Sequence, residues 1–86
     1  MPTSQRWNVL LLNDDFTPME FVVVVLERFF DMDHDDAGTH MFRIHGNGKA
    51  ICGTYSYEEA EKKAADVLAF AGRHKHPLQC VLERAD

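Results

Sequence analysis

The stretch Leu10–Val22 reads LLLNDDFTPMEFV and contains the junction between the first two predicted elements. Its apolar start belongs to Trp7–Leu12, a compact apolar run bounded by turn residues, which predicts a strand. Its second half contains Thr17–Glu20, which is typical of a helix start with a threonine cap and proline at the first helical position. The polar corner between strand and helix indicates either an ordinary turn or a receptor for a cationic group.

The segment after the corner predicts a helix from Pro18 to about Phe30. Its run of four valines conflicts locally with this prediction, because β-branched residues prefer strands. The apolar residues nevertheless recur at helical spacing, and we expect them to face the core. They are Phe21, Val22, Val25, Leu26, Phe29 and Phe30.

A second helix should begin after Asp33, whose side chain is suited to capping it, and should end at Gly46 and Gly48. Lys49–Tyr55 then predicts a second strand, with Ala50 and Cys52 facing away from Ile51.

A second capping box, Ser56–Glu59, begins the third helix. We expect its inward residues to be Ala60, Ala64, Val67, Leu68 and Ala71. A third strand follows at Leu78–Glu83. The order β-α-α-β-α-β predicts an α+β fold, in which a three-stranded antiparallel sheet packs against three helices. It forms one small domain over residues 7–86, after a short flexible lead at residues 1–6.

The 86 residues carry a net charge of −5 and no basic stripe, which argues against nucleic acid and anionic membranes as partners. No apolar run is long enough to span a bilayer, and the N-terminus lacks the apolar core of a signal peptide. Cys52 and Cys80 are too few for a disulfide framework. We therefore expect a cytoplasmic protein with two free core thiols.

Two patterns suggest metal sites but fail on inspection. The acids of Asp31–Asp36 alternate as in a calcium loop, yet the sixth position is Asp36 where glycine is needed. The twelfth position is Phe42 where glutamate is needed. The spacing of the five histidines also suits no zinc site. The sequence predicts neither a metal nor a cofactor.

An enzymatic function, such as an aminopeptidase-like hydrolase, is one alternative. The available hydroxyls are accounted for as caps or helix surface. Cys52 lies in an apparent strand without a basic neighbour to activate it. We predict that the protein is not an enzyme, and turnover of a Leu-starting peptide would contradict this.

A binding function suits the polar corner better. Asn13 offers an amide oxygen, Asp14 and Asp15 offer carboxylate oxygens, and a neutral His45 offers a ring nitrogen. An α-amino group is mostly protonated at neutral pH and carries three donors for such acceptors. Apolar residues beside the corner are able to receive one large side chain: Met19, Val22, Met41 and Ile44.

At this point three blocks resemble a known family: NVLLLNDDFTPMEFVVVVL, HMFRIHGNGKAICGTYSYEEAEKKA and HPLQCVLE. In this order they look like ClpS, the adaptor that brings N-degron substrates to the Clp protease. The resemblance covers Asn8 to Glu83. It implies that the protein binds destabilising N-terminal residues and delivers the substrate to the ClpA unfoldase for degradation by ClpP.

The resemblance also implies roles for individual residues. Asn13 and His45 would accept hydrogen bonds from the substrate ammonium, and Asp14 and Asp15 would add negative potential. Substrates would begin with Leu, Phe, Tyr or Trp, and Met19 would exclude β-branched Val and Ile. The side-chain pocket would be lined by Thr17, Met19, Val22, Met41, Ile44 and Leu78.

By the same resemblance, Glu58 and Lys63 would dock the N-terminal domain of ClpA, and we expect a monomer. The alternative is a regulatory module that binds and modulates the unfoldase with weak or altered N-degron recognition. Val24 and Gly46 stand where relatives carry a polar and a larger residue, respectively. The lead before the fold is also shorter than in many relatives, which bears on delivery rather than on binding.

Overall fold

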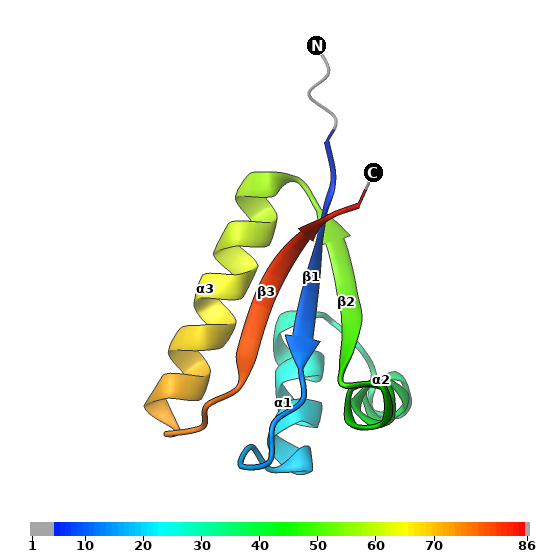
Figure 1. Ribbon diagram of the computed structural model, residues 1–86, viewed down its shortest axis with the longest axis vertical. Coiled ribbons are helices and arrows are strands. Elements are labelled where there is room, and N and C mark those ends of the chain that lie inside the picture. Colours follow the sequence, from blue (N-terminus) through cyan, green and yellow to red (C-terminus); the bar gives the residue numbers. More distant parts are fainter. Residues whose placement is uncertain (1–4, 86) are drawn as a thin grey trace.

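The computed structural model describes residues 5–85 of the chain. Residues 1–4 of the predicted N-terminal lead, and Asp86, lie outside the described residues. The elements occur in the predicted order (Figure 1): β1 (Trp7–Leu12), α1 (Met19–Phe29), α2 (His34–Asn47), β2 (Lys49–Tyr55), α3 (Tyr57–Arg73) and β3 (Gln79–Arg84). The prediction of an α+β fold with three helices and a three-stranded antiparallel sheet is confirmed.

The sheet has the strand order β2-β1-β3, so β1 is central and is paired on both sides (Figure 1). In β1, Leu10 pairs with Ile51 of β2 and with Val81 of β3. The register with β2 shifts between Val9 and Leu10, because Cys52 is inserted there without a partner. Such a bulge increases the local twist of the strand.

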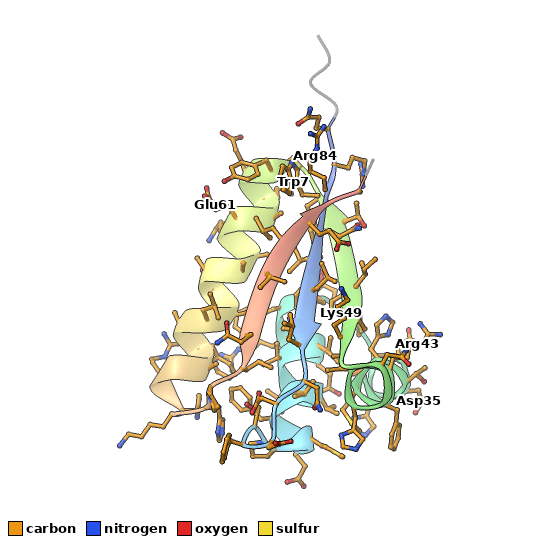
Figure 2. All side chains as sticks on the ribbon, viewed as in Figure 1. Trp7, Asp35, Arg43, Lys49, Glu61 and Arg84 are labelled. Carbon is orange, nitrogen blue, oxygen red and sulfur yellow. The ribbon has the colours of Figure 1, made fainter. Side chains whose placement is uncertain are left out.

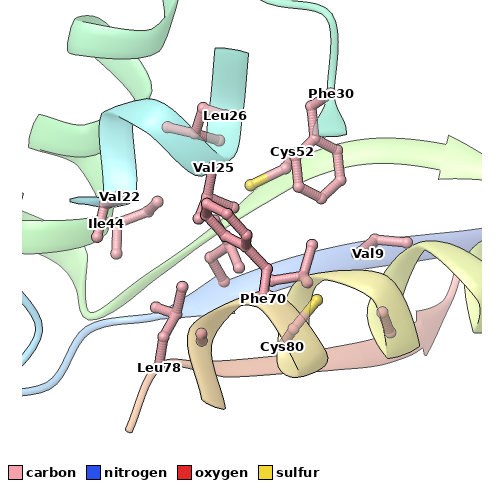
Figure 3. Packing of buried hydrophobic residues seen from close by; sticks show 14 of the residues in the cluster. Val9, Val22, Val25, Leu26, Phe30, Ile44, Cys52, Phe70, Leu78 and Cys80 are labelled. Carbon is pink, nitrogen blue, oxygen red and sulfur yellow. The ribbon is translucent and has the colours of Figure 1, made fainter. Parts of the chain in front are cut away.

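The helices cover the sheet face that carries Val9, Leu11, Cys52 and Cys80 (Figure 3). Leu26 of α1 and Ile44 of α2 contribute to the same buried cluster. Burying one such aliphatic side chain is worth about 1.5–3 kcal/mol, so this cluster is the main source of stability. From α3 and the segment before β3 the cluster includes Ala60, Ala64, Val67, Phe70, Ala71 and Leu78.

Among residues 5–85, no helix packs on the central row of the opposite face of the sheet (Figure 1). Ile51 and Val81 are 46% and 39% exposed there, while Leu10 between them is only 4% exposed. The two flanking side chains shield Leu10, because directly paired residues on one face of a sheet lie about 4.5–5.5 Å apart at Cβ.

Two of the three predicted helix caps are confirmed. The Oδ1 atom of Asp33 accepts a 2.8 Å hydrogen bond from the backbone N–H of Asp36. Ser56 Oγ accepts one of 3.3 Å from the N–H of Glu59. Each bond satisfies a backbone donor that has no partner within its helix.

The predicted cap at Thr17 is wrong. Pro18 is the N-cap residue of α1, and no side chain caps this helix end. The Thr17 hydroxyl instead donates a 2.8 Å hydrogen bond to Oδ2 of Asp14. A nearby carboxylate is a stronger acceptor than a neutral group, so the threonine stabilises the corner rather than the helix.

Three further predictions need correction. The second helix does not end at Gly46 but continues to Asn47, and Gly48 caps it in the left-handed conformation with φ +88°. Leu68 is 42% exposed, and Phe70 takes the inward position on α3. The third strand runs from Gln79 rather than Leu78, a difference within the usual uncertainty of element ends.

Charged side chains lie on the outside of the molecule. Asp35 and Arg43 project from α2, and Glu61 projects from α3 (Figure 2). Within residues 5–85 no charged or polar residue is buried. No helix of this part of the chain is long and apolar enough to cross a membrane.

Candidate functional site

The corner after β1 is tied to the end of α2 by the backbone. The N–H of Asn13 donates a 2.8 Å hydrogen bond to the carbonyl oxygen of Gly48. His45 lies three residues before Gly48, in the last turn of α2. Asn13 and His45 are 32 positions apart in the sequence, and this bond places them at the same edge of the fold.

Asp14 organises the loop that leads into α1. Its Oδ1 atom accepts hydrogen bonds from the backbone N–H groups of Phe16 (2.8 Å) and Thr17 (2.7 Å), and its Oδ2 accepts the Thr17 hydroxyl. Burial alone would favour the protonated acid. The Thr17 side-chain bond, the two backbone bonds and the nearby His76 outweigh it and lower the pKa of Asp14 below its ordinary value of 3.8.

The four residues predicted to bind an α-amino group therefore differ in whether their side-chain acceptors are already used within the protein. Asp14 uses both oxygens within its own loop and contributes a fixed negative charge. The side chains of Asn13, Asp15 and His45 are exposed and form no hydrogen bond with any other residue of the 5–85 segment. These three remain available as acceptors for a ligand.

The residues predicted to line the side-chain pocket are divided between the core and the surface. Val22, Ile44 and Leu78 are buried in the core cluster, and Figure 3 shows Val22 of α1 beside Ile44 of α2. Met41 packs half-buried against this cluster. Met19 is 42% exposed in the first turn of α1. Thr17 is half-buried and hydrogen-bonded to Asp14.

Sequence reasoning missed the part that His76 plays near the corner. Its ring lies edge-on to Phe21, with 4.4 Å between ring centroids, and it acts electrostatically on Asp14. Phe21 in turn stacks on Phe70 of α3 at 5.2 Å. The sequence does carry a signal for the Asp14 loop. An aspartate whose side chain is able to bond backbone N–H groups two and three residues later is typical of an Asx turn.

The predicted unfoldase-binding residues lie on different parts of the α3 surface. Lys63 borders a hollow of about 220 Å³, and its Nζ lies 5.5 Å from the Tyr55 ring centroid. Glu58 is exposed in the first turn of α3 and is not among the residues that line the hollow. The lining residues are Glu59, Lys62, Lys63 and Asp66.

The two cysteines are free and buried, as predicted. Burial raises the pKa of Cys52 and Cys80 to about 12, so neither is a thiolate nucleophile at neutral pH. Between residues 5 and 85, no three His, Cys, Asp or Glu side chains lie together in a way that would hold a metal ion.

Comparison with known proteins agrees with the resemblance noted in the sequence. Residues 2–81 match the family described as ATP-dependent Clp protease adaptor protein ClpS. The ATP-dependent Clp protease adapter protein ClpS of Caulobacter vibrioides is 56% identical over 86 residues, which cover 96% of this chain and 79% of the relative. Its counterpart from Parvibaculum lavamentivorans is 58% identical over 78 residues, covering 91% and 71%.

The fold also matches a solved structure, that of Agrobacterium tumefaciens ClpS2 bound to L-phenylalaninamide. The TM-score is 0.90 at 35% sequence identity, and the match covers 93% of this chain and 96% of the other. Family, relatives and fold agree over nearly the whole described chain, and the chain therefore belongs to the ClpS family of ATP-dependent Clp protease adaptors.

Proposed function

We propose that this adaptor binds proteins that begin with Leu, Phe, Tyr or Trp and delivers them to the ClpA unfoldase for degradation by ClpP. The observation that carries the proposal is the hydrogen bond from Asn13 to Gly48, which holds Asn13 beside the turn that bears His45. Ile44, which precedes His45 in α2, is buried in the apolar cluster, and this supports an apolar pocket beside the acceptors. An amino-acid amide, the ligand of the Agrobacterium relative, has the ammonium and the apolar side chain that such a site would recognise.

The ammonium is the first element of recognition. Asn13 and His45 accept two of its N–H donors, and Asp15 accepts the third directly or through water. The charge of Asp14 strengthens the attraction from within the loop. An acetylated N-terminus is rejected because it lacks the charge and leaves the acceptors without donors.

The first side chain is the second element of recognition. This side chain contacts Met41 and Met19. The floor of the pocket is formed by Val22, Ile44 and Leu78, and Thr17 lines the side next to the polar corner. Burial of one large apolar side chain contributes about 1.5–3 kcal/mol. Met19, which is exposed at the start of α1, excludes Val and Ile because a second branch at Cβ would strike it.

Delivery uses a separate surface. Glu58 and Lys63 on α3 dock the N-terminal domain of ClpA while the N-degron site on the other elements stays open. The protein acts as a monomer in the bacterial cytoplasm and catalyses no reaction itself. A Leu-starting peptide incubated with the protein should accordingly be recovered intact.

Fluorescence anisotropy with peptides that differ only in their first residue tests recognition. Peptides beginning with Leu, Phe, Tyr or Trp should bind tightly, and those beginning with Val or with acetylated Leu should bind at least about tenfold more weakly. The His45→Ala protein should lose binding. Equal, weak binding across the series would contradict the proposal.

Degradation of a Leu-starting reporter by reconstituted ClpA and ClpP tests delivery. Addition of the protein should accelerate degradation, and Lys63→Glu should abolish this acceleration while peptide binding is retained. Inhibition of ClpA without any acceleration of the reporter would instead favour the alternative, a regulatory module with altered recognition.

A further inference from the structure

Two phenylalanines near the proposed binding corner are exposed to solvent. Phe16 is 79% exposed and Phe42 is 66% exposed. They are the two most exposed large hydrophobic side chains between residues 5 and 85. Neither belongs to the buried cluster or to the described side chains packed against it. Their apolar surface therefore contributes little to the stability of the fold.

Phe16 is exposed on a loop that is well held. Its backbone N–H donates a 2.8 Å hydrogen bond to Oδ1 of Asp14, and the N–H of Thr17 donates to the same oxygen. The backbone of Phe16 is thus fixed relative to a charge of the α-amino corner. Because the backbone is already fixed, a contact made by this side chain costs only the ordering of its own rotamers.

Phe42 lies on α2, the helix whose last turn the Asn13–Gly48 bond brings to the corner. It precedes His45 by three positions, so the two residues are neighbours on the helix surface. Ile44, on the buried side, is separated from Phe42 by two positions, or about 200° around the helix. One turn beyond Phe42, a Cβ added at Gly46 would meet nothing within 4 Å, so the surface beside Phe42 is open.

We propose that Phe16 and Phe42 form an aromatic rim that holds the side chain of the second residue of a bound N-terminus. The inference rests on the proposed function, because it needs the first residue to be held at Asn13 and His45. The second Cα is then only about 3.8 Å from the first, which places its side chain at the edge of the corner. The rim selects N-termini whose second residue is aromatic or aliphatic.

The experiment measures anisotropy with two Leu-starting peptides, one with Phe and one with Ser at the second position, and competition by L-leucinamide, which has no second residue. The proteins are the unaltered chain, the double variant Phe16→Ser and Phe42→Ser, and a control, Ile51→Thr and Val81→Thr. The control removes two exposed apolar side chains from the open face of the sheet. Circular dichroism verifies that each variant is folded.

The unaltered chain and the control should bind the Leu-Phe peptide about 3- to 10-fold more tightly than the Leu-Ser peptide, in the range of one aromatic contact. The rim variant should reduce this ratio to below about twofold while L-leucinamide still competes equally well. Those results together would support the rim.

Equal binding of both peptides by the unaltered chain, with normal L-leucinamide competition, would overturn the rim and leave the proposed function intact. Loss of L-leucinamide binding in a folded rim variant would assign the phenylalanines to the first-residue site instead, which also overturns it. An unchanged ratio in a folded rim variant would also overturn the rim. Failure of the unaltered chain to bind any of the three ligands would contradict the proposed function itself.

Discussion

Asn13 and Gly48 are joined by a 2.8 Å hydrogen bond from backbone N–H to carbonyl oxygen. This bond extends the pairing of β1 with β2 by one step beyond Leu12 and Lys49. It also brings the last turn of α2 against the polar corner. The α-amino site that we propose therefore depends on this main-chain contact, which positions the side chains of the site.

Asp14 should stabilise the fold through its ionised form. Asp14→Asn removes the charge that accepts the Thr17 bonds and should lower the free energy of unfolding by about 1 kcal/mol at pH 7. Because the pKa of Asp14 is lowered on folding, its contribution is complete above pH 3.8 and is lost as the pH falls through the folded-state pKa. Urea denaturation of the unaltered protein and the variant at pH 7 and pH 3 measures the loss of stability and its pH dependence.

Asp15→Asn is the matched control, because Asp15 is exposed and forms no hydrogen bond within residues 5–85. It should change the free energy of unfolding by no more than about 0.5 kcal/mol. Equal effects of the two substitutions would contradict the role assigned to the Asp14 hydrogen bonds.

Protonation of the His45 imidazole should weaken peptide binding, because an imidazolium has no acceptor and repels the ammonium. Asp14 stays ionised between pH 5.5 and 8, since its pKa is lowered. His45→Gln should bind more weakly but with a flatter pH profile over this range, measured by anisotropy. His40→Gln on the same helix should keep the original profile, and an unchanged profile in His45→Gln would point to another group, such as His76.

Gly46→Ala should raise the free energy of unfolding by about 0.5–1 kcal/mol, because the position is helical and a Cβ there meets nothing within 4 Å. Gly48→Ala should lower it by about 1 kcal/mol, since Gly48 has φ +88°. Thermal unfolding of both variants gives the comparison. Stabilisation by the second substitution would be inconsistent with the left-handed cap.

Leu26→Ala should lower the free energy of unfolding by about 2–5 kcal/mol, because Leu26 is fully buried in the core cluster. Val24→Ala, two positions earlier on α1, should change it by at most about 0.5 kcal/mol, since Val24 is 41% exposed. Urea denaturation of the pair tests whether α1 presents the predicted face to the core.

The thiols should be slow to react with a disulfide reagent in the folded protein. Burial raises the pKa of Cys52 and Cys80 to about 12, so almost no thiolate is present at pH 8. Both should react rapidly in 6 M guanidinium chloride. A fast-reacting thiol in the native protein would show that one strand opens readily, and Cys52→Ser would identify which.

Several features of the fold were predictable because their causes lie within a few residues. Asp33 and Ser56 each bond an N–H three positions ahead, and the periodicity of Val22, Val25 and Leu26 marks one face of a helix. Leu68 was predicted wrongly, because helical spacing allowed either Leu68 or Phe70 and the packing of Phe21 against Phe70 decided it.

The candidate site also combines features set by neighbouring residues with features set by packing between distant segments. The chemistry of the corner, an amide and two carboxylates after a strand, follows from the sequence because those groups are adjacent in the chain. Packing between segments decides that His45 lies at the same edge and that Phe16 is left exposed. Local hydrogen bonding acts over three or four residues, whereas these relationships depend on how segments about thirty residues apart pack together.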